Sequence, residues 1–329
     1  SSELIFDANI KLKTCLFPYI SVDNVVFEIL PLSEQISSIQ KLTISLHHYA
    51  DLIYLLNSLP LVNYLSVNIY ENGDDRLVPS FYNKLKYLKH FVLVGMSVTV
   101  NYEFIELLLR HIADHLEYLS LNLSFRLRRT TWIDGDYLYK SFLSHMKYLK
   151  RFHFYLTCLM IPNILNETTT STQIISTFRN NFWLNDKKFH VGCYLDHFRD
   201  ISRLCLYSLS FHYDKMSYVS NNFLNDQQQN FKNNSSTNWA NVQRIHLYDD
   251  YKPFPLEFFN MINQTFLNLT ELHIAPLGPT LDYVTLSSGT NEFQDAQLRP
   301  ICQRIKRLTL THSDNQRQWA HQDDFRAYL

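Results

Sequence analysis

Residues 102–124, YEFIELLLRHIADHLEYLSLNLS, contain two different apolar periodicities in direct succession. The first half has apolar residues at helical spacing, which predicts a helix with one apolar stripe. These residues are Ile105, Leu108, Leu109, Ile112 and Leu116. From Leu116 to Leu123 apolar and polar residues alternate, which predicts a half-buried strand. Because neither apolar surface can be buried by this segment alone, similar segments must stack against it.

The strand half recurs along the chain as apolar-x-x-apolar-x-apolar. Aligned on its second apolar position, the motif occurs at Leu42, Leu65, Phe91, Leu119, Phe152, Leu204, Ile245, Leu272 and Leu308. Four of the eight separations between neighbours fit the roughly 20–29 residues of a leucine-rich repeat. We therefore expect an α/β leucine-rich-repeat solenoid. It would have a curved parallel sheet of all nine segments on the concave side, with helices and irregular turns outside.

The motif also predicts the domain organisation. Residues 1–35 lack the motif and are interpreted as an N-terminal cap or the remnant of a preceding element. Residues 36–329 are expected to form the solenoid. Three longer gaps between motifs, near 157–195, 214–240 and 276–300, are interpreted as insertions. The second of them contains a run of Asn, Gln and Ser with few apolar residues, which is typical of a loop.

Composition excludes several classes of function. Lys and Arg (30) balance Asp and Glu (31) without a basic run, so nucleic-acid binding is not expected. The 6 glycines build neither of the usual nucleotide fingerprints, so no cofactor is expected. No apolar run reaches the ~18 residues of a membrane span. The 5 cysteines are scattered without a C-x-x-C pair, which favours a reducing, cytoplasmic or nuclear compartment.

No catalytic or metal-binding pattern emerges from the residues, so we expect a protein that is not an enzyme. Asp196 and His197 lack a nucleophile in a recognisable elbow, and we interpret them as a polar turn. A hydrolase or transferase on a repeat scaffold is the alternative. It would require Asp249, Asp250 and His246 to gather in one pocket or around a metal ion.

The polar side chains between the apolar strand positions would form a parallel array on the concave face. In the C-terminal half this array is rich in Tyr and His, and tyrosine is enriched at protein interfaces. We predict that the array binds a protein partner, although such side chains could also be merely solvated or stacked on one another. The predicted binding residues are Asn68, Asn122, His153, Tyr155, Tyr207, His246, Tyr248 and His273.

Four segments carry a family resemblance: YEFIELLL at 102–109, IDGD at 133–136, LKRFHFYL at 149–156 and FRNNFWLNDKK at 178–188. Through them the chain resembles the leucine-rich-repeat region of F-box/leucine-rich-repeat proteins, in the divergent form found in some invertebrates. The resemblance covers most of residues 36–312.

In that family, an N-terminal F-box docks a Skp-type adaptor of a cullin ubiquitin ligase, and the repeats capture the protein to be ubiquitylated. The resemblance therefore implies a substrate receptor whose adaptor binds only if an F-box lies upstream, since at most residues 4–17 correspond to its tail. The alternative is a general or extracellular leucine-rich-repeat interaction module. The six N-x-S/T sequons would suit the extracellular version.

Overall fold

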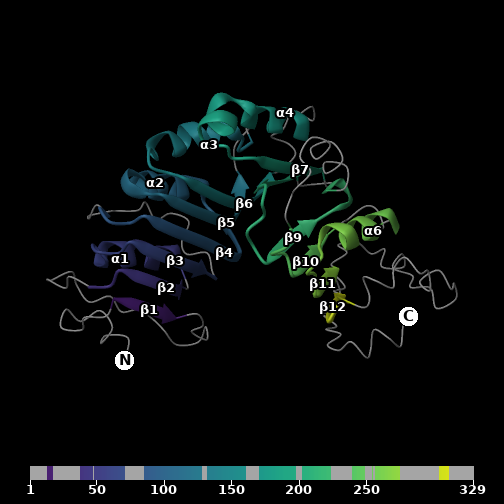
Figure 1. Cartoon of the computed structure of the whole chain (residues 1–329), viewed down its shortest axis with the longest axis horizontal. Helices are drawn as coiled ribbons and strands as arrows, with labels where there is room; N and C mark the ends of the chain where they lie inside the picture. Colours follow the sequence, from purple (N-terminus) through teal and green to yellow (C-terminus); the bar gives the residue numbers. More distant parts are fainter. Residues whose placement is uncertain are drawn as a thin grey trace. The chain divides into compact units, whose positions relative to one another are not determined.

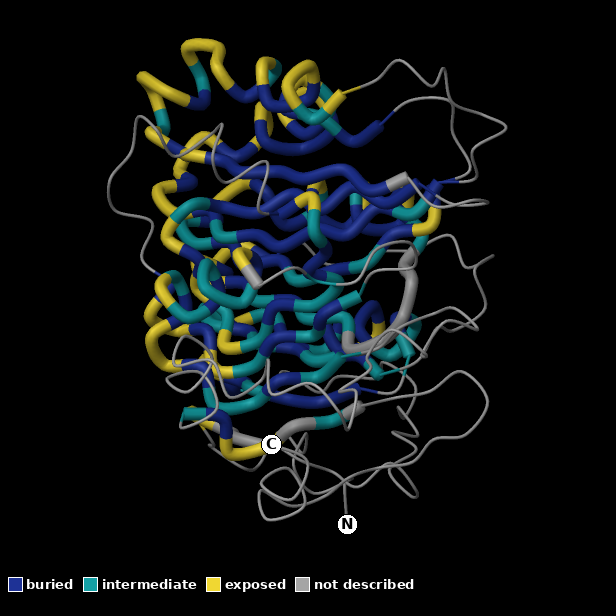
Figure 2. The backbone as a smooth tube through the Cα atoms, turned by 90° about the vertical axis from the view of Figure 1, so that its right-hand side faces the viewer, coloured by how far each residue is buried: buried dark blue, intermediate teal, exposed yellow. Residues whose placement is uncertain are grey.

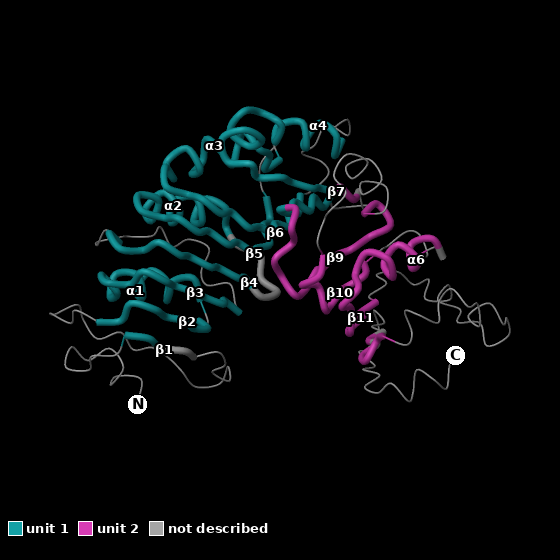
Figure 3. Tube along the Cα trace, viewed as in Figure 1, with its two compact units in different colours: residues 1–193, 200–208 teal, residues 194–199, 209–329 magenta. Residues whose placement is uncertain are grey.

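The computed structural model describes residues 13–17, 38–46, 48–70, 85–127, 132–160, 170–197, 202–223, 239–248, 254, 256–274 and 304–310. These residues form a mixed α/β fold with two sheets (Figure 1). The chain divides into two compact units (Figure 3). Unit 1 contains residues 1–193 and 200–208, and unit 2 contains residues 194–199 and 209–329.

The first sheet has eight strands in the order β1-β2-β3-β4-β5-β6-β8-β7. Their bounds are β1 Thr14–Phe17, β2 Lys41–Leu46, β3 Tyr64–Ile69, β4 His90–Val100, β5 Tyr118–Leu127, β6 Arg151–Met160, β7 Val191–His197 and β8 Ser202–Ser208. From β1 to β6 every neighbouring pair is parallel. The second sheet has four parallel strands in the order β12-β11-β10-β9. They are β9 Lys215–Val219, β10 Arg244–Leu247, β11 Glu271–Ile274 and β12 Arg307–Leu310.

Helical segments connect many of the strands. They are α1 Tyr49–Ser58, α2 Tyr102–Ile112, η2 Ala113–His115, α3 Gly135–Ser141, η3 Leu143–His145, α4 Ser171–Ser176, η5 Thr177–Arg179, the π-helical η6 Phe182–Asp186 and α6 Leu256–Thr265. Local capping explains where several begin. The Asn101 side chain accepts a hydrogen bond from the Glu103 backbone N–H at the start of α2, and Asp134 accepts one from the Tyr137 N–H at the start of α3. Helix α1 packs on β2, and α2 packs on β5.

The predicted apolar anchors of the first sheet lie in register across five strands. Leu42, Leu65, Phe91, Leu119 and Phe152 are direct partners from β2 to β6. All five are at most 3% exposed and belong to the core. Figure 2 colours the backbone by how far each residue is buried. In the second sheet, Ile245, Leu272 and Leu308 are partners in the same way. The predicted parallel pairing is therefore confirmed for these eight segments.

The same backbone arrangement precedes most of these strands. The first apolar residue of the motif donates its N–H to the carbonyl three residues earlier, as in Val62 to Leu59, Leu116 to Ala113 and Val242 to Trp239. The carbonyl just before each of β1 to β5 and β9 to β11 then accepts two consecutive N–H groups, from the first residue of the next strand in the sheet and from the residue before it. For example, the Asn63 carbonyl accepts from the Lys89 and His90 N–H groups. The motif's first apolar position thus closes a tight turn into its strand.

The expectation of one parallel sheet containing all nine motif segments is wrong in two respects. The segments lie in two sheets, and the segment around Leu204 forms β8, which pairs antiparallel with β6. Strands β7 and β8 are neighbours joined by residues 198–201. A connection between two neighbouring parallel strands needs a crossover of about a dozen residues or more. A link as short as residues 198–201 therefore requires β8 to run opposite to β7.

Two of the predicted insertions and the predicted cap contain regular structure. The region near 157–195 contains the end of β6, α4 and most of β7, and the region near 214–240 contains β9. Strand β1 lies within the predicted N-terminal cap and pairs with β2 in the same register that the motif strands use. Residues 276–300 lie outside the described part of the chain.

Candidate interaction surface

The polar faces of β2 to β6 present three lines of side chains, because the strands are parallel and in register. The line nearest the strand starts is Lys41, Tyr64, His90, Tyr118 and Arg151. The middle line is Thr43, Ser66, Val92, Ser120 and His153, and the third is Ser45, Asn68, Val94, Asn122 and Tyr155. We call the first line the basic–aromatic row. It has exposed cations at both ends, and the middle line has mostly small side chains.

Rings in the basic–aromatic row contact one another across strands. The ring centroids of Tyr64 and His90 are 6.2 Å apart, and those of His90 and Tyr118 are 5.6 Å apart with nearly parallel planes. The Tyr118 ring also lies 5.5 Å from that of His153 in the middle line. Burial raises the pKa of the Tyr118 hydroxyl, while a hydrogen bond with Ser120 opposes that rise. The phenol therefore stays protonated at neutral pH and can donate a hydrogen bond.

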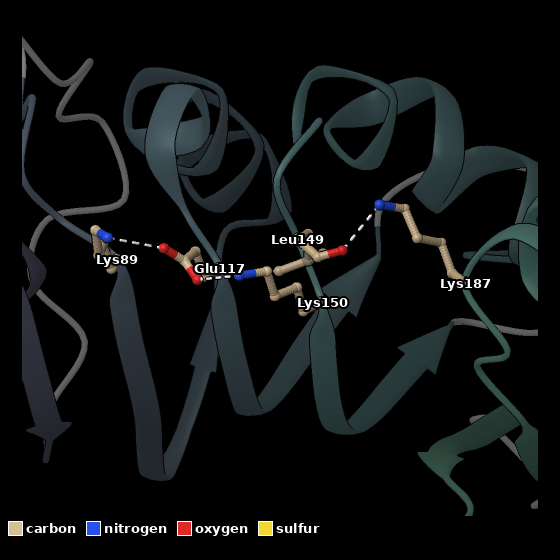
Figure 4. Close-up of polar contacts among 5 residues, drawn as sticks. All are labelled: Lys89, Glu117, Leu149, Lys150 and Lys187. Atoms are coloured by element: carbon tan, nitrogen blue, oxygen red, sulfur yellow. Dashed lines mark hydrogen bonds and ion pairs between the residues drawn. The ribbon is translucent and has the colours of Figure 1, made fainter.

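A chain of charges runs just before the row (Figure 4). The Glu117 carboxylate lies 3.0 Å from Lys89 Nζ and 2.6 Å from Lys150 Nζ, so one carboxylate bridges two lysines from neighbouring strand starts. Hydrogen bonds from Lys150 and then Lys89 lower the pKa of Glu117 to about 2. Lys187 Nζ donates to the Leu149 carbonyl at 2.8 Å. The side chains of the two lysines that Glu117 bridges remain largely exposed, at 57% for Lys89 and 71% for Lys150.

Four of the predicted binding residues lie on this polar face, and three of them are partly accessible. Asn68 and Asn122 occupy the third line, His153 occupies the middle line, and all three are partly accessible. Tyr64, His90 and Tyr118 were absent from the prediction because the polar positions were counted only after each anchor. Extending the same alternation one residue before the anchor identifies them.

The prediction that Tyr155 and Tyr207 face a partner is wrong, because both side chains are buried. Tyr155 is 3% exposed and Tyr207 is fully buried, and they are direct partners across the antiparallel β6–β8 pair. A Cβ atom placed on Gly192 would lie 2.7 Å from the Tyr207 hydroxyl oxygen and would overlap its ring. The glycine therefore makes room for Tyr207 in the interior. Strand β8 pairs beside the carboxyl half of β6 in the same sheet and places Tyr207 next to Tyr155, which explains the burial of Tyr155.

Unit 2 contains the remaining predicted residues: His246 and His273 lie in strands of the second sheet, and Tyr248 directly follows β10. His246 and His273 are register partners with ring centroids 4.5 Å apart. Burial, followed by the positive charge of Lys215 and by His273, lowers the pKa of His246 to about 3. Burial and Lys215 also lower the pKa of His273, so both imidazoles are neutral at pH 7. Tyr248 makes an edge contact with Tyr218, at 5.7 Å between ring centroids.

Several acidic residues have structural roles, and one of them, Asp196, was considered above as a catalytic candidate. Asp134 caps α3, and Asp136 accepts a hydrogen bond from Asn180. Asp196 is buried in β7 and accepts hydrogen bonds from Ser220 and Asn222. Asp249 and Asp250 lie outside the described residues. Within the described part of the chain, no group of three or more His, Cys, Asp or Glu side chains could hold a metal ion.

Two further findings bear on the class of protein. None of the helices described for this chain combines the length and the apolar character that crossing a bilayer requires. In comparisons with known proteins, no family model and no curated protein matches the chain.

Proposed function

We propose that this chain is a leucine-rich-repeat region that recognises another protein without catalysis, as the substrate-binding part of an F-box-type ubiquitin ligase receptor. The observation that carries the proposal is the register of β2 to β6, which aligns the five exposed or partly accessible side chains of the basic–aromatic row in one line across five parallel strands. Repeat proteins use such continuous faces to contact partners.

The recurring backbone geometry supports the repeat assignment. In both units, the carbonyl before a strand accepts two N–H groups from the next strand, as Glu117 does in unit 1 and Gln243 in unit 2. An i to i−3 turn precedes the strands at Leu88, Leu149 and Leu269 as well. Identical local geometry at equivalent motif positions is the expected result of stacking one supersecondary unit repeatedly.

Recognition through the polar face can be tested by site-specific photo-crosslinking with the full chain in an extract of its own cells. A photoreactive residue at Asn68 or Asn122 should capture a defined set of proteins. The same residue at Tyr54, which is 54% exposed on α1, is the matched control. Identical captured sets from Asn68, Asn122 and Tyr54 would contradict recognition through this face.

The ligase part of the proposal makes a separate prediction. Proteins captured at Asn68 or Asn122 should accumulate when cullin ligases are inhibited, and a Skp-type adaptor should co-purify with the protein if it carries an F-box. Captured proteins whose levels and ubiquitylation do not respond to this inhibition would indicate a general interaction module instead.

A further inference from the structure

The starts of β2 to β6 carry an excess of positive charge. Two positions per strand, the residue before the strand and its first residue, contain four cations and one carboxylate among ten residues. The cations are Lys41, Lys89, Lys150 and Arg151, and the carboxylate is Glu117. All four cations are exposed. Glu117 pairs with Lys89 and Lys150, and within the described residues no carboxylate forms an ion pair with Lys41 or Arg151.

The corresponding positions of the second sheet are balanced differently. Arg244 pairs with Asp214, and Arg307 lies 3.3 Å from Glu271. Each of these arginines therefore has its own carboxylate on the same sheet. The same positions of the second sheet also contain Lys215 and Lys306, which makes four cations and two carboxylates among eight residues. The first sheet therefore has the larger excess of cations, and it alone has cations without a carboxylate partner among the described residues at both ends of the row.

The rings between these cations are poorly suited to nucleobases. His90 and Tyr118 stack with an interplanar angle of 22°, so they direct ring faces toward each other. Binding of single-stranded nucleic acid relies on free ring faces on which bases stack. The edges of the row instead offer Tyr hydroxyl and imidazole N–H donors, which match carboxylate acceptors. Charge-assisted hydrogen bonds from Lys and Arg to carboxylates would add to these contacts.

We propose that the basic–aromatic row, together with Lys89 and Lys150, binds an extended acidic segment of a partner protein through its Asp and Glu side chains. This inference rests on the proposed recognition function and specifies the chemistry of the partner. Five strands at ~4.8 Å spacing separate Lys41 from Arg151 by about 19 Å, which an extended segment of about six residues spans. Carboxylates near its two ends would meet Lys41 and Arg151.

The test measures binding of a fluorescent peptide of about six residues with alternating Glu and Ser, using the full chain and fluorescence anisotropy. The matched peptide with Gln in place of Glu and an oligouridylate are the two comparison probes. We expect the Glu peptide to bind at least about tenfold more tightly than the Gln peptide and to weaken as salt increases. Equal binding of the Glu and Gln peptides, or tighter binding of the oligouridylate, would overturn the proposal.

Substitutions test whether the Glu peptide binds at the basic–aromatic row. Lys41→Gln and Arg151→Gln should each weaken binding of the Glu peptide about threefold, since each removes one exposed charge contact. Glu117→Gln should strengthen it about two- to threefold, because it frees two lysines from an internal carboxylate. Lys140→Gln removes an exposed cation from α3 and should leave binding unchanged. Unchanged affinity in both Lys41→Gln and Arg151→Gln, with unchanged thermal midpoints, would contradict the assignment.

Failure of this inference can be distinguished from failure of the proposed function. If the photoreactive residue at Asn68 captures specific proteins and the Glu peptide does not bind, the recognition function stands and the acidic chemistry is wrong. If neither is observed, recognition through this face is wrong as well.

Discussion

The two sheets both align the apolar anchors of their parallel motif strands as register partners, but they differ in the chemistry of their polar faces. In the first sheet, His90 is exposed between two tyrosines, and cations at the strand starts extend into solvent. In the second sheet, His246 packs against His273 beside Lys215, and burial lowers its pKa to about 3. The strand backbone therefore determines which face a side chain occupies. The neighbouring side chains determine whether that side chain is charged and whether it is accessible to a partner. Four predictions test this difference between the two sheets.

The largest effect should come from substitutions on the apolar face, which each of the two sheets has. Leu119→Ala in β5 and Ile245→Ala in β10 remove fully buried side chains, and each should lower the free energy of unfolding by about 2–5 kcal/mol. Asn122→Ala and Thr309→Ala on the polar faces should change it by less than about 0.5 kcal/mol. Chemical denaturation of the full chain measures all four. Similar losses from core-face and polar-face variants would refute the assignment of faces.

The next effect concerns the antiparallel pair, which distinguishes the first sheet from the second. Gly192→Ala should destabilise the protein by about 1–3 kcal/mol, because the new methyl group overlaps the buried Tyr207 ring. In a Tyr207→Leu background the same substitution should cost much less. A double-mutant cycle measures this coupling. Additive losses would mean that Tyr207 does not occupy the space beside Gly192.

The pH response should separate the second sheet from the first. The pKa of His246 is about 3 in the folded protein and ~6.5 in the unfolded chain, so only the unfolded chain takes up its proton between these values. The contribution of the neutral His246 to the free energy of unfolding should therefore be complete above about pH 7. It should decrease as the pH falls below 6.5. Because His246 is only partly buried, we expect a loss of about 1–2 kcal/mol by pH 4.

Denaturation of the His246→Asn variant across this pH range provides the measurement. The variant should show a shallower decrease than the wild type, and Thr309→Ala on the same face should retain the wild-type slope. An unchanged slope in His246→Asn would show that this imidazole becomes protonated normally in the folded state.

The smallest effect on stability should come from the charges of the first sheet. Glu117→Gln should shift the thermal midpoint very little, because ion pairs with exposed lysines contribute little to stability. The pKa of its carboxyl is the more sensitive measurement. An NMR titration should give a value near 2 in the wild type, and Lys89→Gln with Lys150→Gln should return it toward 4.5. A wild-type value near 4.5 would show that the bridge does not form in solution.

Periodicity predicted the strands well wherever apolar anchors alternate with polar residues. The anchors at Leu42, Leu65, Phe91 and Leu119 became register partners because burying one face of each strand leaves only one register that covers every anchor. Strand β9 was missed because its Lys215–Val219 segment lacks the full motif, and its register with β10 shifts between Ile245 and Leu247. Alternation alone cannot identify such an irregular strand.

The binding residues were harder to predict than the strands. Asn68, Asn122 and His153 are on the polar face as the alternation predicts. Tyr155 follows the same alternation, yet β8 pairs with that half of β6 and buries it. Burial of a polar-face residue depends on which strand pairs beside it, and the apolar pattern of a single strand carries no information about its neighbour.

The sequence by itself determined which side of each motif strand is apolar, because a two-residue period assigns alternate side chains to opposite faces. Tertiary structure alone decided that β8 runs antiparallel, that Tyr207 packs on Gly192, and that Glu117 bridges two lysines. The physical reason is that periodicity is a local property of the backbone. Strand direction, burial of polar residues and ion pairing depend instead on contacts between segments far apart in the chain.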